Sequence, residues 1–272
     1  MNIIIGDKSF LSNSLEIYFL KKKINYEKLN LNKFLKYSKF KFENIHIKIF
    51  FFSGFNSQLK TRFVEKNVDQ IQKFLKYIVL NNINCTIYYP SSIYVNYMGH
   101  KTPYLSNYIK AKKKIEELLI ASSTKKIKVW IGRLPSVVRK DLKYLVFSKN
   151  SFFNSIITNF KNTRVISINN FEKRDIVYSN HLFDYFLKLN FHYSKKNFKI
   201  ENITNNYPFN FNKFLKKLIE TNSYLHNQFI IQSFSNKIRY AGVKNKKKCG
   251  NFPTYQLMCD SLIYQIKKIH EL

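Results

Sequence analysis

The sequence predicts an α/β protein whose core is a doubly wound parallel sheet. Short apolar runs, which are typical of buried strands, alternate along the first half of the chain with longer segments in which apolar residues recur at helical spacing. Strands that alternate with helices favour a parallel sheet with helices on both faces and right-handed crossovers. Of the 272 residues, 45% are apolar, which is typical of a globular chain large enough to bury a core.

The expected elements begin with a short apolar strand, Met1–Ile5, that ends at Gly6. A helix over residues 9–23 follows, and its terminal lysines complement the negative end of the helix dipole. Beyond about residue 136 the alternation loosens, so we expect a smaller, partly inserted C-terminal lobe there. The other elements expected before that point are strands over residues 24–30, 45–52, 86–89 and 128–131 and helices over residues 63–81 and 108–121.

The charge balance is strongly basic, because 47 lysines and arginines against 16 acidic residues give a net charge of +31. Such a balance is typical of proteins that bind nucleic acid. The basic residues are dispersed, however, and the densest run, Lys244–Lys248, is short. A coding bias toward Lys, Asn, Ile, Phe and Tyr explains the charge without such a partner, and a positive surface also attracts phosphate-bearing small substrates. Nucleic acid is therefore the less favoured partner.

Cysteine and hydropathy patterns favour a cytoplasmic protein. The three cysteines, Cys85, Cys249 and Cys259, are an odd and widely spaced set that predicts neither a disulfide framework nor a zinc site. No two of the six histidines are spaced as metal ligands. No apolar run reaches the ~18 residues of a membrane span, and the N-terminus lacks the basic flank of a signal peptide. We therefore expect a cytoplasmic chain that binds neither a membrane nor a metal.

The turn after the first strand is a candidate phosphate-binding loop. Dinucleotide-binding folds place G-x-x-G-x-x-G here, because glycines allow a tight turn and let the backbone approach the pyrophosphate at the helix N-terminus. Only Gly6 is present in this sequence, and Ser9 and Ser12 occupy the other two positions. A serine hydroxyl can bond phosphate, so binding is possible, but the segment by itself also fits an ordinary strand–turn–helix.

A Tyr-x-x-x-Lys pair at Tyr108 and Lys112 is a candidate acid/base group. On a helix the two side chains lie one turn apart on the same face, and a nearby ammonium favours the phenolate, which lowers the pKa of the tyrosine. Composition alone produces this spacing often, so only the surrounding sequence can select one pair. The same spacing occurs at Tyr18/Lys22, Tyr37/Lys41, Tyr97/Lys101, Tyr240/Lys244 and Tyr264/Lys268.

The pair Tyr108/Lys112 lies in a wider order of motifs, which selects it. The order is a strand that ends in two serines, a loop containing proline, the Tyr/Lys pair, a glutamate four residues after the lysine, and a strand that ends in Arg-x-Pro. The residues in this order are Ser91 and Ser92, Pro103, Tyr108 and Lys112, Glu116, and Arg133-Leu134-Pro135. This order resembles the extended short-chain dehydrogenase/reductase family. Further segments that resemble the family are Met1–Leu15, Phe52–Gly54, Asn67-Val68 and Lys173–Tyr178.

The resemblance implies a Rossmann-like fold and a role for individual residues. Tyr108 would be the acid/base, and Lys112 would hold the nicotinamide ribose and tune Tyr108. Ser92 would hydrogen-bond the reacting oxygen, with Ser91 the less favoured occupant of that role. Arg174 would contact a substrate diphosphate, which its planar guanidinium suits, although a surface ion pair is the alternative. The residues implied to contact the cofactor, NAD or NADP, are Gly6, Ser9, Phe10, Leu11, Asn30, Phe52, Ser53, Gly54, Lys112 and Pro135.

Departures from the family pattern narrow the implied reaction. Dehydratases of this family carry Asp-Glu where Ile93-Tyr94 stand, which argues against 4,6-dehydration. Asn30 stands where an acidic residue would bind the ribose hydroxyls of NAD. The neutral residue at this position favours NADP as the cofactor. The resemblance thus implies an NAD(P)-dependent oxidoreductase or epimerase of a nucleotide-linked sugar, with ketone reduction favoured. Because two loop glycines are missing, a catalytically degenerate protein that binds a dinucleotide or a partner is the alternative.

The same resemblance implies how the chain is divided and assembled. Residues 1–135 would form the dinucleotide-binding core, and residues 136–272 would complete the sheet and form the substrate lobe. By analogy with the family we also expect a homodimer through the helices over residues 63–81 and 108–121.

Overall fold

The computed structural model describes residues 1–37, 42, 44–53, 61–96, 103–148, 152–169, 173–189, 196–205, 209–221, 230–234, 246–248, 250 and 253–270. The chain divides into two compact units. The first unit comprises Met1–Leu134 and Phe183–Ile203, and the second comprises Pro135–Leu182 and Thr204–Leu272. The first unit therefore ends close to residue 135, where the sequence suggests a boundary, but it also includes a later segment of the chain.

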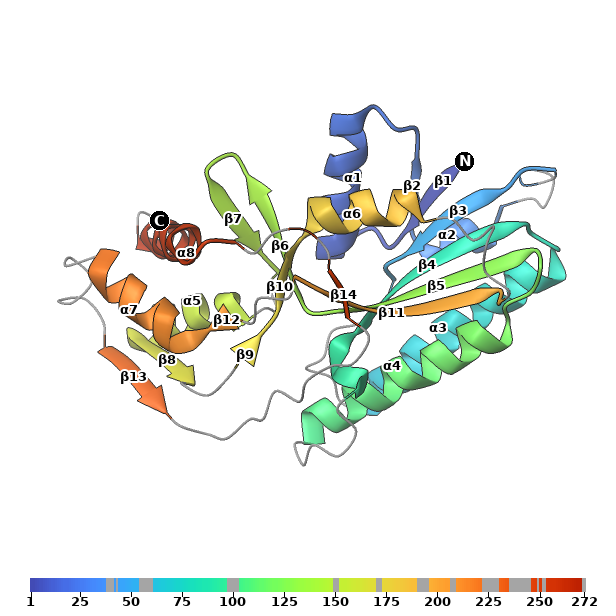
Figure 1. Ribbon diagram of the computed structural model, residues 1–272. Helices are drawn as coiled ribbons and strands as arrows, with labels where there is room; N and C mark the ends of the chain where they lie inside the picture. Colours follow the sequence, from blue (N-terminus) through green and yellow to red (C-terminus); the bar gives the residue numbers. More distant parts are fainter. Residues whose placement is uncertain are drawn as a thin grey trace. The chain divides into compact units, whose positions relative to one another are not determined.

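Six strands of the first unit form a parallel sheet, which confirms the predicted fold class. Each described pairing between neighbouring strands is parallel. Helices α3 (Thr61–Leu80) and α4 (Pro103–Ala121) lie side by side on one face, and α1 (Phe10–Lys22) covers the other (Figure 1). In spatial order the strands are β2 (Glu27–Leu29), β1 (Asn2–Ile5), β3 (Ile47–Phe51), β4 (Cys85–Ser92), β5 (Ile127–Leu134) and β11 (Phe198–Thr204).

The central strand β4 directs its side chains alternately to the two faces of the sheet, as the two-residue period of a strand requires. The ring of Tyr88 stacks on Phe50, with ring centroids 4.7 Å apart, and Phe50 in turn packs against Phe19 of α1. Tyr89 instead belongs to the apolar core on the opposite face, which includes Ile115 of α4. All residues of β4 are buried, because the strand has a neighbour on each side and helices on both faces.

Several element bounds differ from the sequence prediction, and one further helix is present. β4 continues through Ser92 rather than ending at Tyr89, because its pairing with β5 continues to that point. α4 begins at Pro103, before the predicted start, and proline suits the first turn of a helix because its missing N–H would be unpaired there anyway. A short helix that the sequence does not predict, α2 (Leu31–Leu35), follows β2 directly.

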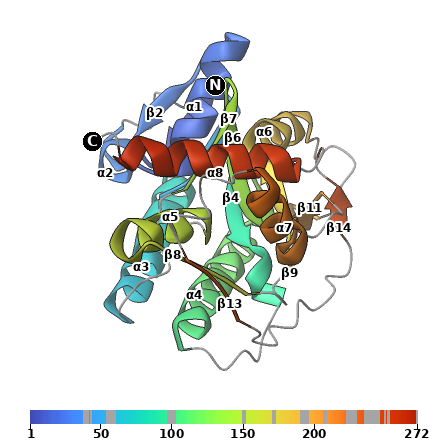
Figure 2. The same cartoon turned by 90° about the vertical axis from the view of Figure 1, so that its left-hand side faces the viewer.

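The second unit packs around a separate apolar core that is rich in aromatic rings. Within it, the rings of Phe147 and Phe153 are stacked with centroids 4.5 Å apart, and Phe153 meets the edges of Phe209 and Phe214. Figure 2 looks onto α8 (Tyr255–His270), which packs against the two other helices of this core, α5 (Phe152–Thr163) and α7 (Phe211–Thr221). The three-stranded sheet of the second unit contains, in spatial order, β10 (Ile176–Tyr178), β6 (Ser136–Asp141) and β7 (Tyr144–Phe147).

Short strands and one further helix complete the described chain. In the second unit, β8 (Val165–Asn169) pairs in parallel with β13 (Ile230–Phe234), and β9 (Lys173–Arg174) pairs in antiparallel with β12 (Phe209–Asn210). The remaining elements are the 3-10 turn η2 (Ile93–Asn96), α6 (Ser179–Lys188) and β14 (Lys246–Lys248). None of the helices in the described ranges is both long enough and apolar enough to cross a membrane.

Candidate active site

Two serines end strand β4 at the carboxyl edge of the parallel sheet, where doubly wound folds bind their ligands. Both Ser91 and Ser92 are 5% exposed. Ser92 accepts a hydrogen bond from the backbone N–H of Tyr94 through its hydroxyl oxygen, at 3.3 Å. The hydroxyl of Ser91 has no hydrogen-bond partner within the described part of the chain. Burying a hydroxyl without a partner is costly, so such a group commonly marks a functional position.

The structure brings Tyr108 to Ser92, as the order of motifs predicts. The two side chains are joined by a hydrogen bond. Burial raises the pKa of Tyr108, the bond from Ser92 lowers it, and the nearby Tyr94 raises it, so that the net shift is upward from about 10. The sequence suggests the opposite direction, because it places the Lys112 ammonium against the phenol. The phenol is instead held in its protonated form, as a proton donor requires.

Lys112 follows Tyr108 by one turn of α4, but its ammonium bonds to the strand. Its Nζ donates to the hydroxyl of Tyr89 at 3.0 Å and to the carbonyl oxygen of Pro90 at 3.0 Å. The same nitrogen lies 5.9 Å from the centroid of the Tyr108 ring. Burial lowers the pKa of Lys112 to about 8, against the opposing effect of the Glu116 carboxylate. The ammonium thus lies beside Tyr108 without replacing Ser92 as its hydrogen-bond partner.

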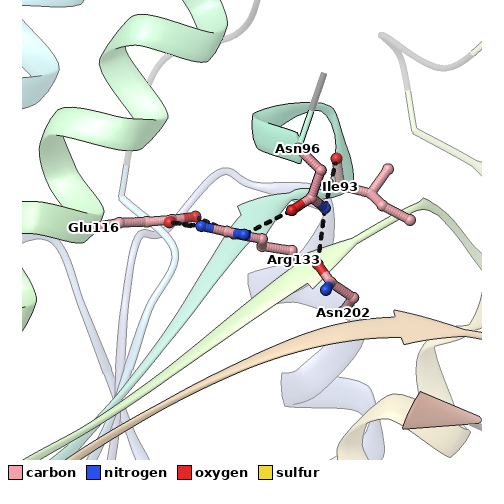
Figure 3. A network of polar contacts seen from close by, with 5 residues as sticks. All are labelled: Ile93, Asn96, Glu116, Arg133 and Asn202. Carbon is pink, nitrogen blue, oxygen red and sulfur yellow. Dashed lines mark hydrogen bonds and ion pairs between the residues drawn. The ribbon is translucent and has the colours of Figure 1, made fainter. Parts of the chain in front are cut away.

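A buried ion pair connects α4 to the end of β5 (Figure 3). Glu116, which is 2% exposed, receives hydrogen bonds from Nε and Nη2 of Arg133, the closest at 2.7 Å. Arg133 also donates from Nη1 to the side-chain oxygen of Asn96 at 2.7 Å. The amide nitrogen of Asn96 donates in turn to the carbonyl oxygen of Ile93 and to the side chain of Asn202. This network joins the helix that carries Tyr108 to the turn that follows Ser92, which fixes their separation.

The turn after β1 approaches the end of β3 so closely that only glycine fits. Gly6 has a φ of +120°, and a Cβ there would lie 2.8 Å from the backbone carbon of Phe52 and 2.8 Å from the nitrogen of Ser53. Ser9 then caps α1, since its hydroxyl oxygen accepts from the N–H of Ser12 at 3.0 Å. The Ser12 hydroxyl is fully buried and has no partner among the described residues. The loop therefore keeps the backbone geometry of the first glycine of the pattern, at Gly6. At the position of the second glycine it has Ser9, which caps the helix.

The other predicted cofactor residues that the structure describes lie at the ends of β2, β3 and β5 and in the first turn of α1. The side-chain oxygen of Asn30 caps α2 by accepting from the N–H of Lys33 at 2.9 Å. The hydroxyl of Ser53 donates to the side-chain oxygen of Gln70 at 3.3 Å. Phe10 and Leu11 are partly buried in the first turn of α1, and Pro135 follows β5 in the second unit. Gly54 lies outside the described residues. Arg174, the residue predicted to contact the substrate, lies in β9, and its side chain is outside the description.

Tyr89 is a site residue that motif reasoning does not identify. It belongs to no motif in the sequence, and the adjacent Tyr88 is equally buried and equally aromatic. The motif order locates Ser92 on the strand. Tyr89 lies three positions earlier, so in a regular strand the two side chains would point to opposite faces of the sheet. Only the packing of α4 against β4 shows that the hydroxyl of Tyr89 meets Lys112.

The first unit therefore combines a parallel, doubly wound sheet with serine, tyrosine and lysine side chains near the carboxyl end of one strand. Comparison with solved structures leads to the same fold. The chain is similar to UDP-glucose 4-epimerase from Bifidobacterium longum in complex with NAD+ and UDP, with a TM-score of 0.67 and 12% identity, over 99% of this chain and 98% of that one.

Two further solved structures of this fold are similar over nearly the whole chain. RMD from Pseudomonas aeruginosa, complexed with NADPH, has a TM-score of 0.65 and 11% identity, over 98% of this chain and 99% of that one. L-threonine 3-dehydrogenase from Trypanosoma brucei has a TM-score of 0.64 and 12% identity, over 100% of this chain and 98% of that one. No protein-family model matches the chain, and no curated protein matches it. At these identities the comparisons establish the fold, while the reaction has to be argued from the site.

Proposed function

We propose that this protein is an NAD(P)-dependent oxidoreductase or epimerase that acts on a nucleotide-linked sugar, with reduction of a ketone as the favoured reaction. The observation that carries the proposal is the meeting of Ser92, Tyr108 and Lys112 at the carboxyl end of β4. Tyr108 is hydrogen-bonded to Ser92, and its raised pKa keeps a proton available at neutral pH. A positioned proton donor of this kind is what reduction of a carbonyl requires.

The described residues of the turn after β1 fit a dinucleotide. Gly6 brings the backbone close to the end of β3, and α1 begins immediately afterwards, so that the helix N-terminus can face a pyrophosphate. The first turn of α1 contains no acidic residue that would repel phosphate, and the acidic residue of the turn before it, Asp7, is followed by Lys8. The buried hydroxyls of Ser12 and Ser91 have no partner among the described residues, and each could bond a ligand.

Each residue then has a step in the reduction. A reduced nicotinamide, when bound, would supply a hydride to the carbonyl carbon. Tyr108 donates its phenolic proton to the carbonyl oxygen, which becomes the hydroxyl, and Ser92 hydrogen-bonds that oxygen while its charge develops. Lys112 would hold a ribose hydroxyl of the cofactor through its ammonium, and its charge would stabilise the phenolate that Tyr108 becomes. In epimerisation the same groups would work in both directions, with Tyr108 first accepting a proton.

The substrate class and the assembly are parts of the same proposal. Two of the similar structures carry names or ligands that point to different substrates: UDP-glucose 4-epimerase with UDP, and L-threonine 3-dehydrogenase. The strongly basic chain, with a net charge of +31, favours a phosphate-bearing substrate such as a nucleotide sugar. We include contact of Arg174 with the substrate diphosphate, a homodimer through α3 and α4, and a cytoplasmic location.

A second function, binding without catalysis, is supported by the phosphate loop. Two of its glycines are serines, Ser9 is used as a helix cap, and Asn30 caps α2 where an acidic residue would bind ribose. One series of experiments separates the two functions. Thermal unfolding with NADPH and with NADH measures binding, because a ligand at 100 times its dissociation constant adds about 2.7 kcal/mol to the stability of the fold. Turnover is then measured with a panel of nucleotide-linked keto-sugars. Binding with turnover supports the enzyme, and binding without turnover on any keto-sugar supports the second function. The absence of a shift with either cofactor contradicts the enzyme and a second function in which the ligand is a dinucleotide.

A further inference from the structure

Two adjacent tyrosines of β4 differ in what their hydroxyls can reach. Tyr88 is 1% exposed and lies among aromatic rings, stacked on Phe50 and in contact with Trp130 and Phe186. Tyr89 is 3% exposed and lies on the other face, where its hydroxyl accepts a hydrogen bond from Lys112. The pair therefore contains one residue in contact with the candidate site and one matched neighbour that is not.

The Lys112 ammonium is held by β4 on two sides. An ammonium has three N–H donors, and Tyr89 and the Pro90 carbonyl oxygen, each 3.0 Å from Nζ, account for two of them. Nζ is also 4.7 Å from the centroid of the Tyr89 ring, closer than the 5.9 Å to that of Tyr108. At the shorter distance the face of the ring attracts a cation as well. The direction of the ammonium is set mainly by Tyr89 and Pro90, and among the described residues no other side chain or carbonyl accepts its third donor, which a ligand could therefore take.

The charges around Lys112 make this contact important. On α4 the cation faces Tyr108 and the Glu116 carboxylate, and Glu116 is itself paired with Arg133 of β5. Tyr94 of η2 acts on the same cluster through Tyr108. Burial lowers the pKa of Lys112 to about 8. Burial also raises the pKa of Tyr89 well above 10, so Tyr89 stays a neutral phenol whose oxygen can accept from the ammonium.

We propose that Tyr89 is a positioning residue, which holds the Lys112 ammonium beside Tyr108 with one donor directed to the cofactor ribose. The ribose contact rests on the function proposed above, whereas the hold of Tyr89 on Lys112 does not. The backbone carbonyl of Pro90 cannot be removed by substitution, so the hydroxyl of Tyr89 is the part of the hold that can be tested. Tyr89→Phe removes that hydroxyl and keeps the ring, and Tyr88→Phe removes a hydroxyl of equal burial from the other face.

The test is the titration of Lys112 itself, in the full chain without cofactor or substrate. Wild type, Tyr89→Phe and Tyr88→Phe are labelled with acetic anhydride over a pH series, and mass spectrometry of the peptides gives the pKa of Lys112. The exposed Lys110 on the same helix is the internal control. Because the phenol oxygen bonds the ammonium more strongly than the neutral amine, Tyr89→Phe is expected to lower the pKa of Lys112 by about one unit, while Tyr88→Phe leaves it unchanged.

The outcomes separate this inference from the proposed function. An unchanged Lys112 pKa in Tyr89→Phe overturns the inference, and so does an equal change in Tyr88→Phe, which would indicate a general effect on the strand. Tyr89→Leu is a second variant, which removes the ring together with the hydroxyl and should lower the pKa of Lys112 at least as far. Where wild-type turnover is detected, the alkaline limb of the kcat/KM profile should move to lower pH by the same unit in Tyr89→Phe. The labelling result stands even if no keto-sugar is turned over, because it needs neither cofactor nor substrate.

Discussion

Removing Arg133 should be the most destabilising single change in the network of Figure 3. The Glu116 carboxylate is 2% exposed, and Arg133 binds it through two nitrogens. Arg133→Met keeps much of the side-chain volume but leaves a buried carboxylate without its cation. Breaking a buried pair in this way costs about 3–5 kcal/mol, and we expect the lower end, since the Arg133 side chain is 20% exposed.

The assay is urea unfolding followed by the fluorescence of Trp130, the single tryptophan, which is fully buried in β5. The double variant Arg133→Met/Glu116→Gln removes the charge as well and should recover much of the loss, because no unpaired ion remains. Lys114→Met is the matched control on the same helix. Its partner Glu117 is 4.0 Å away, and both side chains are more than half exposed, so the change should be small. If Arg133→Met unfolds at the same urea concentration as Lys114→Met, the argument from the buried charge is wrong.

Further predictions address the reaction, the loop, the pH dependence and the assembly. Tyr108→Phe should lower turnover of keto-sugars by ~10²-fold or more with little change in stability. Tyr264→Phe, from another Tyr-x-x-x-Lys pair, should leave turnover unchanged, and equal losses in the two variants would refute the choice of pair. Gly6→Ala should lower the melting temperature and weaken NAD(P)H binding, because a φ of +120° and a 2.8 Å approach to the backbone both disfavour a Cβ. A melting temperature equal to that of the wild type would contradict this prediction. The pKa of Lys112 is about 8 in the folded chain, so cofactor affinity measured by fluorescence should fall as pH rises through that value, and Lys112→Met should abolish the pH dependence. Light scattering at tens of micromolar should show a dimer, and a monomer would remove the homodimer without affecting the enzyme.

As the pH rises, loss of the proton from Lys112 affects the stability of the fold and the binding of the cofactor in opposite directions. Its folded-state pKa of about 8 is lower than that of an ordinary lysine, so between the two values the unfolded chain binds more protons. Stability contributed by this group therefore rises with pH through that window, while the charge that would hold the ribose is lost. The site thus keeps a destabilising buried ammonium at neutral pH, which is common where a charge serves function rather than folding.

Local sequence patterns were sufficient for the fold class, and they pointed to one of the tyrosine–lysine pairs. Apolar runs and helical spacing depend on neighbours within about 10 to 18 residues, and the sheet follows from their alternation. The selection of Tyr108 depended on the order of Ser92, the Tyr/Lys pair and Arg133, and order along a chain is visible without coordinates. The hydrogen bond between Ser92 and Tyr108 is the structural counterpart of that order.

Only the tertiary structure decided how the residues of the site act on one another. Tyr88 and Tyr89 are indistinguishable in the sequence, and it is the packing of α4 on one face of β4 that gives Tyr89 the Lys112 ammonium. Likewise, the pKa of Tyr108 rises because burial outweighs the bond from Ser92, and burial is a property of everything packed around a group. The sequence by itself pointed to Ser92, Tyr108 and Lys112 as candidates, because that choice depends on local pattern and order, but it did not point to Tyr89. Their protonation states and hydrogen-bond partners depend on contacts between segments far apart in the chain, which the sequence does not specify position by position.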